Sequence, residues 1–180
     1  MVYTFLANGF EEIEALAPVD MLRRAGIEVV TVGIGGRVVN GGHDIVVTMD
    51  IDESQMHTNG LEAIILPGGL GGTEMLDKSE AVHKMIDYCM EKGVLIAAIC
   101  AAPSILGKRG FLKGKKATAY PTFQKYLTDA NISDEYVCRS GNIITARGMG
   151  VSLEFSAEII ATLKGPKVAD EILEQIQCPK

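Results

Sequence analysis

Short apolar segments alternate along this chain with longer segments of helical pattern, and this alternation constrains the fold more than any other feature. The apolar segments cover residues 2–7, 27–34, 61–66, 93–99 and 115–119. The helical patterns cover residues 11–25, 73–92, 102–108, 151–163 and 168–176. Strands that alternate with helices form βαβ units, in which helices cover both faces of a mostly parallel sheet. We therefore expect a single α/β domain over residues 1–180, an ordinary domain length.

Three smaller features complete the expected fold. Residues 37–39 and 44–48 predict a hairpin, and residues 136–140 and 142–146 predict a tight strand pair around Gly141. Residues 122–128 indicate a short helix. In a parallel sheet the reactive crevice lies at the carboxyl ends of the strands. The turns at residues 8–14, 67–72 and 99–103 are therefore the candidate positions for a site.

The composition argues against several classes of function. The chain has 17 basic and 23 acidic residues and a net charge of −6, whereas nucleic-acid-binding proteins have a basic surface. No apolar run approaches the roughly 20 residues of a membrane span. The N-terminal residues lack the pattern of a signal peptide, so we expect a cytoplasmic protein. The four cysteines lack the spacing of a zinc site, so we expect reduced thiols, no metal and no cofactor.

Cys100 has the strongest chemical signal in the chain. It directly follows the apolar segment at residues 93–99, and Pro103 suits the first turn of a helix. A strand, a sharp turn and a helix form a nucleophile elbow, and Ala101 and Ala102 leave room for the bend. A thiol at a helix N-terminus has a lowered pKa and a larger thiolate fraction. A buried core cysteine is the alternative that this pattern leaves open.

Glu14 lies on a helix face that is otherwise apolar, with Ala17, Met21 and Ala25 at positions i+3, i+7 and i+11. Because burial raises the pKa of a carboxyl group, this position predicts a protonated glutamate. An acid that compensates the helix dipole would give the same pattern. Glu11 and Glu12 are interpreted as solvated or ion-paired surface acids. The histidines are interpreted as surface residues and not as metal ligands or bases: His43, His57 and His83.

Residues 66–72 (LPGGLGG) form a glycine-rich turn after an apolar segment. Glycines at such a place let backbone N–H groups converge on an anion, although an ordinary flexible turn has the same composition. The pattern is neither GxGxxG nor Walker A, so we expect no dinucleotide or ATP phosphate site.

Residues 8–20 (NGFEEIEALAPVD), 66–69 (LPGG) and 97–103 (AAICAAP) follow one another in an order that resembles the ThiJ/PfpI superfamily. The similarity is strongest to the subgroup of the Parkinson-disease-associated deglycase and its bacterial relatives. Residues 145–155 (TARGMGVSLEF) extend it over nearly the whole chain.

The resemblance implies a flavodoxin-like α/β/α sandwich with a mostly parallel central sheet, and a homodimer. It implies that Cys100 is a reactive, oxidation-prone cysteine and that a protonated Glu14 hydrogen-bonds its sulfur. It also implies that the backbone amides of Gly69 and Ala101 form an oxyanion-binding pocket. Further residues are expected near this pocket or at a dimer interface: Gly68, Tyr120, Asp20 and Arg147 for the pocket, and Glu11, Arg24 and His43 for the interface.

Tyr120 is the one clear departure from the family pattern, because hydrolase-like members have a histidine at this position. Without a Cys–His pair, we expect no protease activity.

Three functions remain open. The first is a glyoxalase or deglycase activity, in which the Cys100 thiolate adds to a reactive dicarbonyl or its early adduct and Glu14 shuttles the proton. The second is a redox sensor or stress chaperone that depends on oxidation of Cys100. The third is a role in thiamine biosynthesis, which the family name suggests. The expected partners are thus a small reactive carbonyl or oxidant and a second copy of the chain, with no nucleic acid and no membrane.

Overall fold

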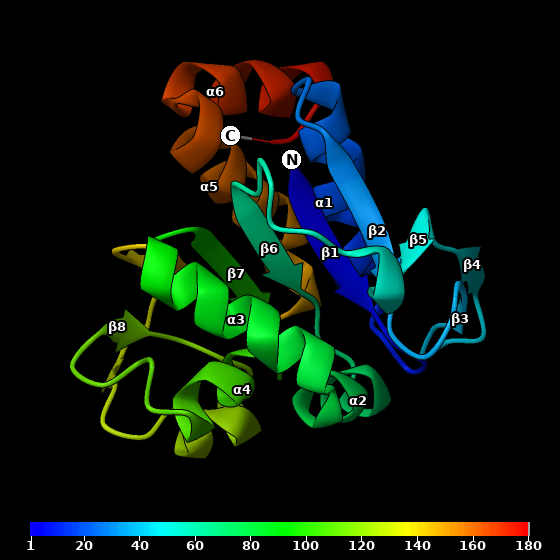
Figure 1. Cartoon of the computed structure of the whole chain (residues 1–180). Helices are drawn as coiled ribbons and strands as arrows, with labels where there is room; N and C mark the ends of the chain where they lie inside the picture. Colours follow the sequence, from blue (N-terminus) through cyan, green and yellow to red (C-terminus); the bar gives the residue numbers. More distant parts are fainter. Residues whose placement is uncertain (180) are drawn as a thin grey trace.

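The centre of the molecule is a seven-stranded sheet with the strand order β10-β11-β7-β6-β1-β2-β5 (Figure 1). The computed structural model describes residues 1–179. The strands, in chain order, are β1 (Val2–Leu6), β2 (Val29–Gly33), β5 (Ile51–Asp52), β6 (Ala63–Leu66), β7 (Leu95–Ile99), β10 (Val137–Ser140) and β11 (Ile143–Ala146). All neighbours pair parallel except β10 and β11, which form the predicted antiparallel pair. The mostly parallel sheet is therefore confirmed.

Two helical layers cover the two faces of this sheet (Figure 1). The helices are α1 (Glu12–Arg24), α2 (Leu70–Lys78), α3 (Glu80–Lys92), α4 (Pro103–Lys108), α5 (Ser152–Lys164) and α6 (Pro166–Gln175). Side chains of α2, α3 and α4 pack in one core with Tyr3 and Phe5 of β1, whereas α1, α5 and α6 pack in a second core with Val2. Alternate residues of one strand thus reach opposite layers, as the period of two requires. The structure is the expected α/β/α sandwich.

The predicted helix at residues 73–92 is wrong in its bounds, because the structure has two helices there. Helix α2 begins earlier, at Leu70, and Ser79 separates it from α3. Ser79 has an extended ψ of 116°, and its side chain accepts a hydrogen bond from the amide of Val82. It is thus an N-cap, which starts a new helix in a new direction.

The segment at residues 115–119 does not join the central sheet as expected. Only β8 (Lys116–Ala117) forms there, and it pairs with β9 (Asn131–Ile132) in a separate two-stranded sheet. The amide of Thr118 then donates to the Thr145 hydroxyl of β11, which holds β8 beside the main sheet by a side-chain contact. The short helix expected at residues 122–128 is present as a 3₁₀ helix over Pro121–Tyr126.

The predicted hairpin exists as β3 (Val38–Asn40) and β4 (Val46–Thr48), which pair antiparallel beside the sheet. An isolated bridge between Phe10 and Gly41 joins the loop of this hairpin to the turn after β1. The turns that follow β1, β6 and β7 meet at one edge of the molecule. The Glu11 amide donates to the Gly68 carbonyl at 3.0 Å, and a Cβ at Gly68 would lie 2.6 Å from the Cβ of Cys100. Among the described residues, no helix is both long enough and apolar enough to span a membrane.

Candidate functional site

Cys100 lies directly after β7, in the sharp turn between this strand and α4. Its φ is 64°, a left-handed conformation that residues other than glycine rarely adopt. Two backbone hydrogen bonds hold this turn: the Cys100 amide donates to the Ala146 carbonyl (2.9 Å), and the Tyr120 amide donates to the Cys100 carbonyl (2.8 Å). The backbone thus has the strand–turn–helix form that the sequence predicts.

Glu14 meets Cys100 from the first turn of α1. Its side chain is buried, and its Oε2 accepts a hydrogen bond from the Gly68 amide at 2.9 Å. A second hydrogen bond joins the carboxyl group to the Cys100 thiol. Gly68 leaves the space for this pair, because a Cβ at that position would lie only 3.1 Å from the Cys100 sulfur and 2.6 Å from its Cβ.

The backbone amides of Gly69 and Ala101 both donate toward the Cys100 sulfur. Gly69 has a φ of 86° and is the N-cap of α2, so the turn after β6 reaches across to the turn after β7. Together these two N–H groups form a pocket for a negative charge beside the sulfur.

Burial raises the pKa of Glu14 to about 7, against the lowering effect of its hydrogen bonds with Cys100 and Gly68. The carboxyl group is therefore poised to hold or release a proton near neutral pH, which is the property of an acid–base catalyst. The direction of this pKa shift agrees with the sequence-based expectation of a protonated Glu14.

The pKa of Cys100 differs in direction from the sequence-based expectation. Burial raises the pKa of its thiol to about 12, and the charge and hydrogen bond of Glu14 add to this effect. The amides of Gly69 and Ala101 lower it. The expected helix effect is weak because α4 begins only at Pro103 and has six residues. Protonation of Glu14 removes the repulsion, so a thiolate at Cys100 requires a neutral Glu14.

A cavity of about 530 Å³ opens beside the Cys100 sulfur. Residues from the three turns, the hairpin loop and the 3₁₀ helix line it: Gly9, Glu11, Gly42, His43, Gly69, Leu70, Gly71, Cys100, Ala101, Tyr120, Thr122 and Phe123. This volume holds a small organic molecule together with several waters, since a water takes about 30 Å³. Tyr120 is at the cavity wall, as expected.

Asp20 and Arg147 lie outside this cavity. Asp20 is exposed and forms a 2.7 Å ion pair with Arg24. It is the sixth residue after Glu14, so it lies on another face of α1. Arg147 lines a separate cavity with Tyr120 and lies over the ring of Tyr136 at 5.0 Å. Tyr120 therefore separates the two cavities.

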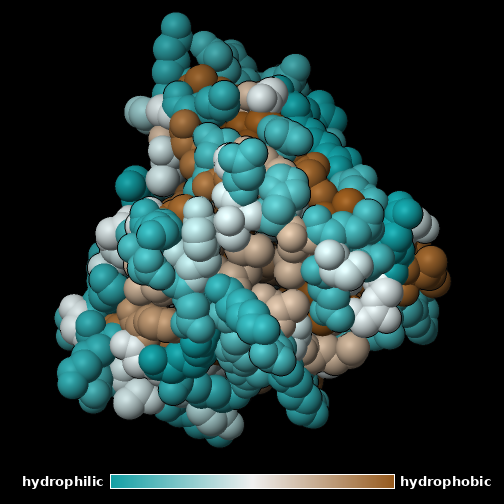
Figure 2. Space-filling model, viewed as in Figure 1, coloured by the Kyte–Doolittle hydropathy of each residue, from teal (hydrophilic) through white to brown (hydrophobic). Residues whose placement is uncertain are grey.

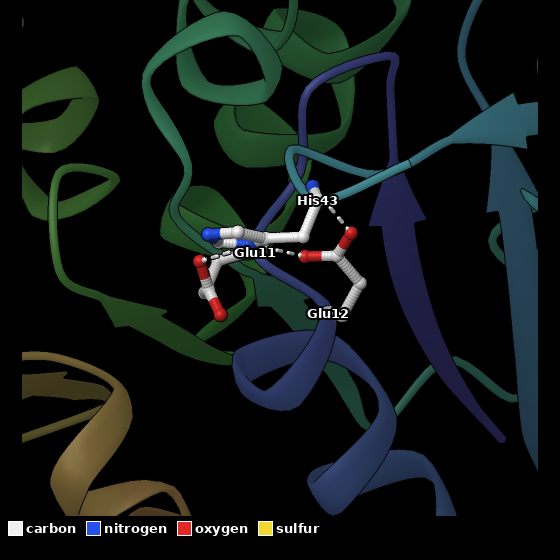
Figure 3. A group of neighbouring side chains, drawn as sticks. All are labelled: Glu11, Glu12 and His43. Atoms are coloured by element: carbon white, nitrogen blue, oxygen red, sulfur yellow. Dashed lines mark hydrogen bonds and ion pairs between the residues drawn. The ribbon is translucent and has the colours of Figure 1, made fainter. Parts of the chain in front are cut away.

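His43 lies between Glu11 and Glu12 at the rim of the Cys100 cavity (Figure 3). Its ring Nδ1 is 2.9 Å from Glu12 Oε2 and 3.6 Å from Glu11 Oε2, and its backbone amide donates to Glu12 Oε1 at 2.7 Å. The ligand atoms of the three residues lie within 4.8 Å of one another. Because His43 already satisfies both oxygens of Glu12, we describe the group as an ion-paired network.

Glu12 is the residue that sequence reasoning interpreted wrongly. It forms an ion pair with His43, which agrees with the expected ion pairing. However, it is only 4% exposed, so it is not a surface acid. Gly41 makes room for it, since a Cβ there would lie 2.8 Å from Glu12 Cγ. The only sequence signal is the Gly41-Gly42 pair before His43, which permits a close approach of the backbone.

The chain is similar in sequence and in structure to several known proteins. The model of the "DJ-1/PfpI family" matches residues 1–162. The chain is 38% identical over 170 residues to the Drosophila melanogaster protein dj-1beta, covering 93% of this chain and 91% of that protein. The crystal structure of Drosophila melanogaster DJ-1beta superposes with a TM-score of 0.94 at 34% identity, over 99% of this chain and 98% of that one. A Caenorhabditis elegans protein, "Glutathione-independent glyoxalase DJR-1.2", is 27% identical over 168 residues, 92% of this chain and 89% of that protein.

Proposed function

Because the chain belongs to the DJ-1/PfpI family, we propose that it is a cysteine-dependent enzyme of carbonyl stress that converts α-oxoaldehydes such as methylglyoxal to hydroxy acids. One observation carries the proposal. A single sulfur, a carboxyl group with a pKa of about 7 and two convergent amides face one another beside a cavity large enough for a small carbonyl compound. The nematode relative that is named a glyoxalase supports the same reaction.

The first step adds Cys100 to the aldehyde. Glu14 takes the thiol proton, the sulfur bonds to the aldehyde carbon, and the amides of Gly69 and Ala101 stabilise the oxygen anion that forms. Glu14 then returns the proton to this oxygen, which gives a hemithioacetal. The charge of the pair stays at one negative unit throughout, which suits a buried site.

The second step isomerises the hemithioacetal. The Glu14 carboxylate removes the proton from the former aldehyde carbon and delivers it to the neighbouring carbonyl carbon, while the hydroxyl proton moves to the oxygen on that carbon. The product is a thioester of the hydroxy acid on Cys100. Water hydrolyses this thioester and restores the thiol. The sum is addition of one water, without net oxidation, so neither a cofactor nor a metal is required. Early adducts of the same dicarbonyls on amines would enter by the same first step, as in a deglycase.

The test is product analysis with the purified full chain and methylglyoxal. We expect hydroxy acid from wild type, none above background from Cys100→Ser, and at least about a 100-fold loss in Glu14→Gln, since acid–base catalysis contributes roughly 10²–10⁴-fold. Cys178→Ser is the matched control, because Cys178 lies outside the cavity lining. A chelator should leave the rate unchanged, and a peptide substrate should not be hydrolysed. Equal product from Cys100→Ser and wild type would contradict the proposal.

A second candidate is a redox sensor in which Cys100 is oxidised. The same amides and the protonated Glu14 would hydrogen-bond the oxygens of a sulfinate. Wild-type protein that forms no hydroxy acid but retains rapid oxidation of Cys100 would favour this function over the enzyme.

We also propose that the protein is a homodimer and that it acts in the cytoplasm. Exposed apolar side chains lie on the hairpin, in its loop and in the first turn of α1: Ile13, Val38, Ile45 and Val46. Apolar surface is also visible in Figure 2 at the edge of the molecule that carries the hairpin. A second copy of the chain would bury these side chains.

A further inference from the structure

The proposed reaction needs a base that sequence reasoning did not supply. Hydrolysis of the thioester requires activation of a water molecule, and Tyr120 lines the cavity beside Cys100. A phenol is a poor base at neutral pH. Glu14 is already the proton carrier at the sulfur, and it is 1% exposed, so bulk water does not reach it freely. The water must be activated from another wall of the cavity.

His43 lies on that wall. It lines the same cavity as Cys100 and Ala101, and its side chain is 71% exposed, so its ring is open to water and to a bound molecule. It comes from the hairpin loop, which the bridge between Phe10 and Gly41 and the hydrogen bond from the Gly42 amide to the Phe10 carbonyl (2.8 Å) fix against the turn before α1. The exposed side chain of His43 therefore extends from a backbone that these contacts hold in place.

Glu12 orients this imidazole as a carboxylate orients the base of a hydrolase. One oxygen accepts from the backbone amide of His43 and the other contacts its Nδ1, so the neutral ring carries its proton on Nδ1. Nε2 is then the atom that can accept a proton. Glu12 is nearly buried and its fit depends on the missing Cβ of Gly41, which marks a built arrangement rather than a chance surface pair.

On the basis of the proposed function, we propose that His43, held by Glu12, is the catalytic base that activates water to release the hydroxy acid from Cys100. Water gives one proton to Nε2, and its oxygen bonds to the acyl carbon of the thioester. The C–S bond then breaks and its electron pair stays on the sulfur. The proton on Nε2 returns to the sulfur through solvent, so the products are the free acid and the thiol.

The charges around the ring fit this role. The groups that face His43 are Glu12 and Glu11 at the start of α1 and Asp44 in its own loop, and all three are acidic. The hydrogen bond with Glu12 and the charge of Glu11 are the largest causes that raise the pKa of His43 above 6.5. Two carboxylates beside one imidazole leave the rim with net negative charge even when the ring is protonated. The site therefore favours uncharged α-oxoaldehydes over α-oxo acids.

The decisive experiment compares His43→Gln with His57→Gln, which removes an exposed histidine that is not part of the cavity lining. We expect His43→Gln to form the Cys100 adduct at the wild-type rate, to accumulate it in intact-protein mass spectra, and to lose about 100-fold in steady turnover. His57→Gln should match wild type in both measurements. Equal turnover in the two variants would overturn the role of His43 and leave the proposed function standing. Absence of hydroxy acid from wild type would overturn both.

The pH profile separates a base from a structural residue. Because the neutral ring is the active form, the rate at which wild type releases its Cys100 thioester should fall as the pH drops through the pKa of His43. Glu12→Gln removes the largest cause of the raised pKa, so this acidic limb should move to lower pH. Glu11→Gln should move the acidic limb in the same direction. Because Glu11 is more exposed than Glu12, this variant provides the test if Glu12→Gln does not fold. An acidic limb that stays in place in both variants would contradict the assignment.

Discussion

Cys100 and Glu14 each determine the charge of the other. Burial disfavours a charge on either group, and the hydrogen bond between them allows one proton to serve both. Gly68 sets the distance, because its amide holds Glu14 and its missing side chain makes room for the sulfur. The reactivity of Cys100 thus depends on proton transfer within the buried pair that it forms with Glu14.

Glu14→Gln should stabilise the protein at alkaline pH. The folded-state pKa of Glu14 is about 7 against an ordinary value of 4.5. Below pH 4.5 the carboxyl is neutral in both states, and as the pH rises through 7 the folded protein must hold a buried charge and loses stability. A glutamine avoids this cost, so we expect its free energy of unfolding at pH 8 to exceed that of wild type by about 3 kcal/mol.

This difference should disappear at pH 4, as measured by urea unfolding at both pH values. Glu154→Gln, at an exposed position on α5, is the control and should show no such dependence. A constant difference between Glu14→Gln and wild type at the two pH values would contradict the assignment of the shift to burial.

Cys100 should be the cysteine that mild peroxide oxidises first. Cys89 and Cys138 are buried, whereas Cys100 is partly exposed and lines an open cavity. Cys178 is partly exposed, but only Cys100 has two amides and a carboxyl group that stabilise a sulfur oxyanion. Peptide mass spectrometry should locate the added oxygen on Cys100, and earlier oxidation of Cys178 would argue against this pocket.

At the scale of elements, the site depends on how the turn after β6 crosses to the turns after β1 and β7. Gly69 begins α2 and its φ of 86° with ψ of 132° aims its amide at Cys100. A Cβ there would lie 2.6 Å from the Glu11 amide nitrogen and 2.7 Å from the Phe10 carbonyl carbon, both backbone atoms. The glycine is therefore required by the close approach of two turns.

Gly69→Ala should consequently cost much more stability than Gly93→Ala. Gly93 has a φ of 69° at the end of α3, with nothing within 4 Å of an added Cβ. We expect Gly93→Ala to lower the free energy of unfolding by about 1 kcal/mol from backbone strain alone, and Gly69→Ala by at least about 3 kcal/mol. Denaturant unfolding of the two variants tests this, and equal losses would refute the steric argument.

The sequence predicts the long elements and the edge of the sheet that carries the site, because apolar periodicity and turn residues are local signals. It does not reveal the break at Ser79, where a side-chain cap overrides a continuous helical pattern. It places Cys100 beside Glu14 by pattern and resemblance, but the direction of the thiol pKa shift depends on burial, which only the packed structure gives. The burial of Glu12 depends on His43, 31 residues away in another loop.

At the scale of the whole molecule, we expect self-association through the hairpin edge. Val46 on β4 is 63% exposed and belongs to the apolar side chains at this edge. Ile132 on β9 is also exposed, at 47%, but lies in the separate β8–β9 sheet. Arg24, an expected interface residue, already pairs with Asp20 in its own chain, so apolar contacts should contribute most.

Sedimentation should give a dimer for wild type at micromolar concentration and a monomer for Val46→Asp. Ile132→Asp should remain dimeric, as the control for an added charge. A wild-type monomer, or dimers in both variants, would contradict this interface.

The left-handed backbone at Cys100 has a consequence for how such a protein changes under selection. Glycine adopts a φ of 64° without strain, so the backbone would be more relaxed if the reactive side chain were absent. In a mutant library selected for thermostability alone, we expect glycine to become enriched at position 100 and chemical reactivity to disappear. Selection for survival under carbonyl exposure should restore cysteine. Retention of cysteine under the first regime would mean that the sulfur stabilises the fold by more than the turn strains it.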